Sequence, residues 1–144
     1  MPVALQWEPH GVVRTLSGTV EIEEYMDSVA SLQNDARFDE LRFIVEDFSD
    51  CTMQHVSEAD MEMVLANAIG AAYSNPYIRI AAVAVEPQAR HLIQLFAKAS
   101  PFITRVFAQM AQAREWVGDG DTTAVPLDVR LQAAIDFDPR PQPC

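Results

Sequence analysis

The sequence has few cysteines and no long apolar run. Its two cysteines, Cys51 and Cys144, make a poor disulfide framework, so we expect a reducing compartment, the cytoplasm. No segment approaches the roughly 20 consecutive apolar residues of a membrane span. The N-terminal stretch MPVALQWEPHG also lacks a basic region followed by an apolar one. We therefore expect a soluble protein with no signal peptide and no membrane insertion.

Basic residues are also scarce. The chain has 10 Lys and Arg residues against 21 Asp and Glu residues, which gives a formal net charge of -11. Proteins that bind nucleic acids need clusters of Lys and Arg to displace counterions from the phosphates. DNA, RNA and anionic membrane surfaces are therefore unfavourable partners.

Apolar residues are plentiful, at 49% of the 144 residues, which suffices for one domain with a core that needs no disulfide or metal. The apolar runs predict strands at 3–7, 11–18, 41–48, 76–87 and 102–108. Helical spacing and capping signals predict helices at 19–35, 57–75, 87–100 and 109–117, with Ser57 as the N-cap of the second and Pro87 opening the third. We expect Gly11 to supply the unusual dihedral of a turn between the first two strands.

This alternation of strands and helices predicts an α/β fold. Short connections between them favour βαβ units and a mainly parallel sheet of about five strands, with an antiparallel N-terminal hairpin and about four helices. We expect this domain to span 1–117. Residues 118–144 are expected to form a linker and C-terminal tail, with a short helix over 127–137 whose apolar side packs on the domain or on a second subunit of a homodimer.

The most polar stretch follows the predicted strand 41–48, where open α/β sheets usually bind ligands. We predict a binding or regulatory loop here, with Glu86 beside it at the end of the next long strand. Its candidate residues are Asp47, Ser49, Asp50, Cys51, Thr52, Ser57 and Glu86.

Three kinds of chemistry compete for this loop with plain turn formation and helix capping. A phosphate at Ser57 would sit on a helix N-terminus, but acidic neighbours would repel it. Cys51 with His55 would suit nucleophilic catalysis, although the acids raise a thiol's pKa and no family signature surrounds the cysteine. Metal binding by Asp47, Asp50, His55 and Glu86 lacks a known ligand spacing. We predict no metal and no cofactor.

An apolar pocket is a fourth alternative. Methionine and phenylalanine side chains around the helix at 57–75 suit a cavity for a lipid-like molecule, although most of them stand at core spacing. They include Phe43, Phe48, Met53, Met61, Met63 and Phe96.

Four segments of this chain resemble the SpoIIAA-like family, within the STAS (sulfate transporter and anti-sigma antagonist) type of fold. They are GVVRTLSGTVEIEEYMDSV, LRFIVEDFSD, IRIAAVAVE and ITRVFAQMAQAREWV, and the similarity spans about residues 5–117. The regulatory members of this type carry a phosphorylatable serine in a DSSG-like motif after the central strand. This chain has SDCTMQHVSEAD there, so the resemblance does not imply the phosphorylation switch, and it implies no catalytic residue.

The leading interpretation is therefore a non-enzymatic STAS-like domain that acts through protein interaction or small-ligand binding at the carboxyl ends of its strands. The chief alternative is a carrier or sensor of an apolar ligand, bound between the sheet and the helix at 57–75. A hydrolase that uses Cys51 and His55 is the third.

Overall fold

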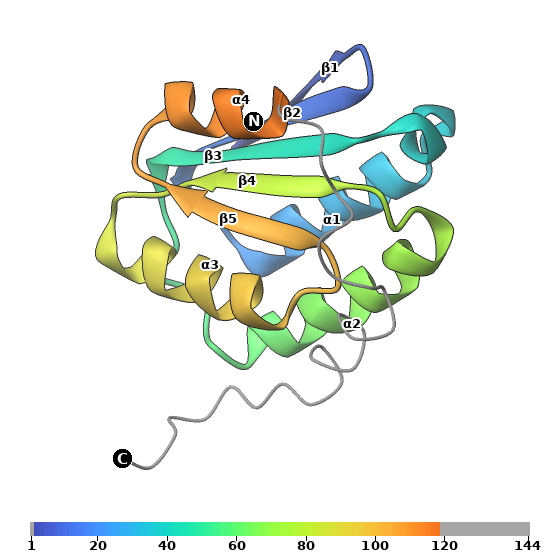
Figure 1. Ribbon diagram of the computed structural model, residues 1–144. Coiled ribbons are helices and arrows are strands. Elements are labelled where there is room, and N and C mark those ends of the chain that lie inside the picture. The colour runs from blue at the N-terminus through green and yellow to red at the C-terminus, as the bar shows by residue number, and fades with distance from the viewer. Residues whose placement is uncertain (1, 119–144) are drawn as a thin grey trace.

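The computed structural model describes residues 2–118, which form a five-stranded sheet with helices on both faces (Figure 1). The elements are β1 (Val3–Glu8), β2 (Gly11–Thr19), α1 (Ile22–Gln33), η1 (Ala36–Glu40), β3 (Phe43–Thr52), α2 (Asp60–Ser74), β4 (Arg79–Val83), α3 (Pro87–Ala99), β5 (Ile103–Phe107) and α4 (Met110–Gly118). The predicted α/β fold with five strands, an N-terminal hairpin and four α-helices is confirmed. The 3₁₀ helix η1 was not predicted.

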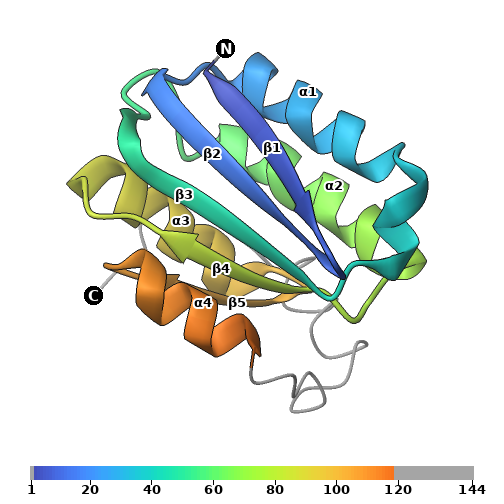
Figure 2. The same ribbon diagram turned by 90° about the horizontal axis from the view of Figure 1, so that it is seen from above.

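The strands lie in the sheet in their order along the chain, β1-β2-β3-β4-β5. β1 and β2 are antiparallel and every other pair is parallel, as the predicted βαβ units require. Helices α1, α2 and α3 cover one face of the sheet, and α4 lies alone on the other (Figures 1 and 2). The carboxyl ends of β2, β3 and β4 therefore meet the N-termini of α1, α2 and α3 at one edge.

The central strands are buried on both faces, and their side chains alternate between two cores. Ile44 and Ile80 belong to the large core beneath α1, α2 and α3, whereas Val45 and Ala81 belong to the smaller core beneath α4. This double burial explains why residues 43–48 of β3 and 80–83 of β4 are mostly apolar in the sequence.

The hairpin between β1 and β2 differs from the prediction in one residue. Gly11 was expected to take the unusual dihedral, but His10 takes it, with φ 62°. Gly11 is required for another reason, because a Cβ at this position would overlap the ring of Phe43 on β3. The glycine therefore serves the close approach of two strands and not the turn.

The chain after α4 lies outside the described residues. The predicted linker and tail, 118–144, and its predicted short helix fall there, except for Gly118, which ends α4. Within residues 2–118, no helix is both long and apolar enough to cross a bilayer.

Candidate functional site

Four of the predicted site residues lie together at the carboxyl edge of the sheet. Asp47 of β3 is in register with Val83, the last residue of β4, and Glu86 follows as the N-cap of α3. The charges of Asp47, Glu86 and Asp50 all act on the thiol of Cys51. The structure thus brings three carboxyl groups around one cysteine.

The expected loop at residues 49–52 is wrong, because these residues continue strand β3. After an irregularity between Thr15 and Ser17, β2 pairs with Asp50, Cys51 and Thr52 of β3. β4 ends opposite Asp47, so residues 48–52 pair with β2 alone. The predicted strand ended at residue 48, where its apolar run ends. The observed strand continues to Thr52 because its backbone keeps pairing with β2.

Cys51 has the properties of a core residue and not of a nucleophile. Its side chain is buried, and its Sγ donates to the carbonyl oxygen of Phe48 at 3.5 Å. Burial, with the negative charges of Asp47, Glu86 and Asp50, raises the pKa of the thiol to about 11. His55, the base that the hydrolase needs, is hydrogen-bonded instead to Glu21. The geometry gives no support to a hydrolase that uses Cys51 and His55.

The remaining polar residues of this edge are engaged mostly in local structure. Asp47 accepts a hydrogen bond from the Ser49 backbone at 3.0 Å, and Thr52 accepts one from the Gln54 backbone at 3.3 Å. Among the three predicted hydroxyl residues, only Ser49 is fully exposed with no side-chain hydrogen bond among the described residues.

Ser57 and Asp60 form a reciprocal pair of hydrogen bonds just before α2. The Ser57 backbone donates to Asp60 Oδ2 at 2.9 Å, and the Asp60 backbone donates to Ser57 Oγ at 3.1 Å. The helix itself begins at Asp60, with Ala59 as N-cap, so the prediction that Ser57 is the N-cap is wrong. Hydrogen bonds from residues 60–62 reach back three residues, not four, and form a tight turn before α2.

At this edge, the N-termini of α1 and α3 are occupied by the chain's own carboxylates, whereas α2 has no side-chain cap within the described part of the chain. Glu86 accepts hydrogen bonds from the Gln88 and Ala89 backbones at the start of α3, and Glu21 and Glu24 form a capping box at the start of α1. A phosphate would have to compete with these groups for the same N–H donors. The edge therefore favours a basic partner over an anionic ligand.

Two histidines, not recognised in the sequence as a pair, hold the segment 53–59 that joins β3 to α2. His55 Nδ1 lies 2.6 Å from Glu21 Oε1 at the start of α1, and His91 Nε2 of α3 lies 2.6 Å from Glu58 Oε1. Gln88 Nε2 also donates to the Val56 carbonyl oxygen at 3.4 Å. The segment is thus fastened to α1 on one side and to α3 on the other.

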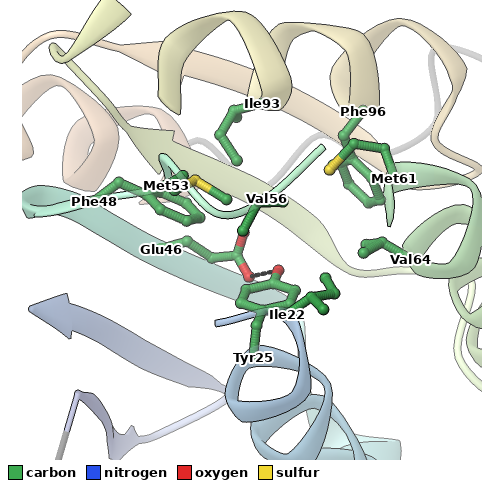
Figure 3. A pocket seen from close by; sticks show the side chains of 10 residues that line it. All are labelled: Ile22, Tyr25, Glu46, Phe48, Met53, Val56, Met61, Val64, Ile93 and Phe96. Carbon is green, nitrogen blue, oxygen red and sulfur yellow. Dashed lines mark hydrogen bonds between the residues drawn. The ribbon is translucent and has the colours of Figure 1, made fainter. Parts of the chain in front are cut away.

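The most unusual group of the molecule is a charged cluster inside the large core. Arg14 of β2 and Glu46 of β3 are in register and form an ion pair, although only 2% and 5% of their surfaces are exposed. Tyr25 of α1 donates its hydroxyl hydrogen to Glu46 Oε1 at 2.8 Å, as Figure 3 shows, and accepts from Arg14 Nη1 at 3.1 Å. Burial, followed by the negative charge of Glu46, raises the pKa of Tyr25 strongly.

Sequence reasoning missed this cluster, but a signal was present. Arg14 and Glu46 each directly follow two buried β-branched residues of a strand, Val12–Val13 and Ile44–Val45, and a charged residue in such a place is rarely buried without a partner. Here one hydrogen-bonding group remains without one, because the buried Nε of Arg14 has no partner. An unpaired buried donor costs free energy comparable to a lost hydrogen bond.

Two small cavities meet at this cluster. One, of about 50 Å³, lies between the sheet, α1 and α2 beside Arg14, and the other, of about 10 Å³, lies under the segment 53–59. Tyr25 and Glu46 line both. Apart from these two, the smaller cavity is lined by apolar side chains from α1, the 53–59 segment, α2, α3 and β3 (Figure 3): Ile22, Phe48, Met53, Val56, Met61, Val64, Ile93 and Phe96.

Most of the apolar residues predicted for a ligand pocket are core residues. Phe48, Met53, Met61 and Phe96 are buried and line this interior, whereas Met63 is exposed. Within residues 2–118, no three His, Cys, Asp or Glu side chains are grouped so as to hold a metal ion.

Comparison of the sequence with protein-family models and with curated proteins finds no match. Among solved structures, the chain is similar to an uncharacterised protein of the DUF3478 family from Shewanella loihica PV-4, described as having a SpoIIAA-like fold. The TM-score is 0.52 at 11% sequence identity, over 80% of this chain and 91% of that one. This likeness and the mixed five-stranded sheet with its four helices show that the chain has a SpoIIAA-like fold.

Proposed function

We propose that this chain is a non-enzymatic binding domain that holds a small amphipathic molecule between the sheet and helices α1–α3. The observation that carries the proposal is the buried Arg14–Glu46–Tyr25 cluster, which borders two cavities and leaves Arg14 Nε without a partner. A core that served stability alone would do as well with apolar residues here, because a buried ion pair is often no more stabilising than they are.

The chemistry of the interior defines the ligand class. Arg14 Nε requires an acceptor, such as a carbonyl, hydroxyl or carboxylate oxygen, and the surrounding side chains require an apolar body. A cavity of about 50 Å³ admits little more than one or two waters as it stands, so a larger molecule needs the interior to widen.

The segment 53–59 is the natural entrance. Met53 and Val56, both buried, close the smaller cavity, and hydrogen bonds between half-exposed side chains, His55 to Glu21 and His91 to Glu58, also fasten the segment. Exposed pairs of this kind contribute roughly 0.2–1 kcal/mol each. Opening the segment therefore breaks these two weak pairs and exposes Met53 and Val56, at about 1.5–3 kcal/mol for each apolar side chain, while the sheet and the helices stay folded.

Native mass spectrometry of the protein purified from its own cells tests the proposal. We expect a mass above that of the chain which disappears on denaturation, and which the variant R14M/E46L loses while staying folded. The control is R79M, because Arg79 is another buried arginine but packs against Trp116 of α4 on the opposite face of the sheet.

The same protein is then titrated with laurate, palmitate and 1-anilinonaphthalene-8-sulfonate. A ligand at 100 times its Kd stabilises the folded state by about 2.7 kcal/mol and raises the melting temperature accordingly. Two results together would refute the proposal. They are a native mass equal to that of the chain alone, and a melting temperature that none of these molecules raises. A mass of two chains would instead indicate a homodimer.

A second candidate function is the binding of a basic protein partner at the carboxyl edge. Ser49 and Asp50 are exposed there, beside Asp47 and Glu86, and no cation pairs with these three acids among the described residues. Cross-linking in cells should give a partner that D50N loses and that D39N retains, since Asp39 is exposed in η1 before β3, far along the strand from its carboxyl end. Equal loss in both variants would reject this site, and S49A tests whether the Ser49 hydroxyl takes part.

The free, buried thiol of Cys51 is consistent with a reducing compartment, so this proposal includes the cytoplasm as the location.

A further inference from the structure

β1 forms an open edge of the sheet. It pairs with β2 on one side, and no strand within residues 2–118 pairs with its other side. The Ser17 backbone donates to the Pro2 carbonyl oxygen at 2.8 Å, so in this antiparallel pair the even-numbered residues of β1 bond to β2. The N–H and C=O groups of Val3 and Leu5 therefore point outward, available to another strand.

A groove of about 620 Å³ runs along this edge between β1 and α1, which lie side by side in Figure 2. The strand side of the groove is apolar, and the helix side is a polar stripe at the spacing of one helix face. Its lining residues are Pro2, Val3, Ala4, Leu5, Glu24, Asp27, Ser28 and Ser31. The volume lies within the range of about 300–1,000 Å³ that is usual for ligand pockets.

The charge of the groove selects its occupant. Two of the lining residues are acids, Glu24 and Asp27, and none is a base. A second copy of this chain, paired edge to edge, would bring its own acids toward these two. Each copy also carries a net charge of -11, so the two copies would repel each other. Residues 119–144 are also a poor match, since they carry five aspartates and two arginines.

We propose that the β1 edge and its groove bind an extended peptide segment of a partner protein, with Arg or Lys at alternate positions. Four hydrogen bonds to Val3 and Leu5 would add the segment to the sheet as a sixth strand. Its alternate side chains face α1, where their aliphatic stems cover Val3 and Leu5 and their charged ends reach Glu24 and Asp27. This surface lies outside the core that holds the interior site, and its acids are not Asp47, Asp50 and Glu86 of the second candidate site.

The test is a titration of the full chain with the peptide acetyl-Val-Arg-Val-Arg-Val-amide, followed by the amide signals of the protein in ¹H–¹⁵N NMR spectra. We expect shifts at Val3, Leu5 and the α1 stripe 24–31, and none with the peptide that has Glu in place of Arg. E24Q/D27N should weaken binding about threefold to tenfold, as expected for two exposed ion pairs. The control E23Q removes an exposed α1 acid that does not line the groove and should leave the affinity unchanged.

Methylation of the peptide nitrogens tests strand addition directly. One peptide is N-methylated on both arginines and another on two valines, and strand addition requires that only one of the two lose binding. Equal affinities for both would overturn the proposal, as would shifts confined to Asp47, Asp50 and Glu86. A dimer of the chain alone that the peptide dissociates would show that a second copy occupies the edge, and would overturn the choice of partner.

Discussion

Substituting Arg14 by methionine should destabilise this protein more than removing an exposed charge does. The change leaves Glu46 buried, 5% exposed, with Tyr25 as its only remaining side-chain hydrogen-bond donor within residues 2–118. Breaking a buried ion pair from one side costs about 3–5 kcal/mol, because the remaining charge stays out of water. In a domain of this size, that loss lowers the melting temperature by on the order of 10–20 °C.

The matched control is R114M, which breaks another Arg–Glu pair between distant elements. Arg114 of α4 donates two hydrogen bonds to Glu8 of β1, both at 2.6 Å, but its side chain is 42% exposed. Its loss should cost at most about 1 kcal/mol. The double variant R14M/E46L removes both buried charges and should recover most of the stability that R14M loses.

Urea unfolding followed by circular dichroism measures all three variants against the original chain. If R14M and R114M lowered the free energy of unfolding equally, that result would refute the argument that burial makes the Arg14–Glu46 pair costly to break. If R14M/E46L were much less stable than the original chain, the pair would be a net source of stability, and our reason for assigning it a binding function would fail.

Three further predictions concern other parts of the molecule. The pKa of Cys51 is raised from 9.0 to about 11, so its contribution to stability is fully present below about pH 9 and is lost as the pH rises through 11. In a C144S variant, Ellman's reagent should react slowly with Cys51 at pH 8 until urea unfolds the chain. Rapid reaction of the folded protein would contradict the burial of the thiol. G11A should lower the free energy of unfolding by about 1–3 kcal/mol, because its Cβ meets the Phe43 ring. G70A lies in α2, where a Cβ meets open space, and should raise the free energy of unfolding by about 0.5–1 kcal/mol. If urea unfolding ranked the two variants the other way, the packing explanation would be refuted. H55A/H91A should speed hydrogen exchange of the amides at 53–59 while changing the global unfolding free energy by no more than about 2 kcal/mol, and unchanged exchange would show that these histidines do not hold the segment.

The elements with a strong periodic pattern were predictable. α3 begins at Pro87 as predicted, because proline suits the first helical turn and leaves no unpaired N–H. The double-sided burial of β4 followed from its near-continuous apolar run, but the strand covers only Arg79–Val83 and not the predicted 76–87, because its pairing with β3 and β5 is limited to these five residues. Element ends were less predictable: α2 starts three residues after Ser57, because a tight turn intervenes, and β3 is longer than its apolar run, because its polar end pairs with β2.

The candidate site divides in the same way. Proximity of Asp47 and Glu86 followed from the parallel sheet, because the carboxyl ends of neighbouring parallel strands meet at one edge. The burial of Cys51 did not follow, since its polar neighbours in the sequence suggested an exposed loop. The pairing of His55 with Glu21, 34 residues away, has no local signal at all.

By itself, then, the sequence determined the order of strands and helices, the parallel sheet and the acidic character of the chain, because each depends on composition or on neighbours a few residues apart. Only the tertiary structure decided that Arg14 meets Glu46 inside the core, that Gly11 lies under Phe43 and that β1 leaves an acidic groove beside α1. These features depend on the register between strands and on how helices lie over the sheet, which join residues far apart in the chain. The interior site and the β1 groove arise from that second set, whereas the acidic carboxyl edge followed from the parallel sheet.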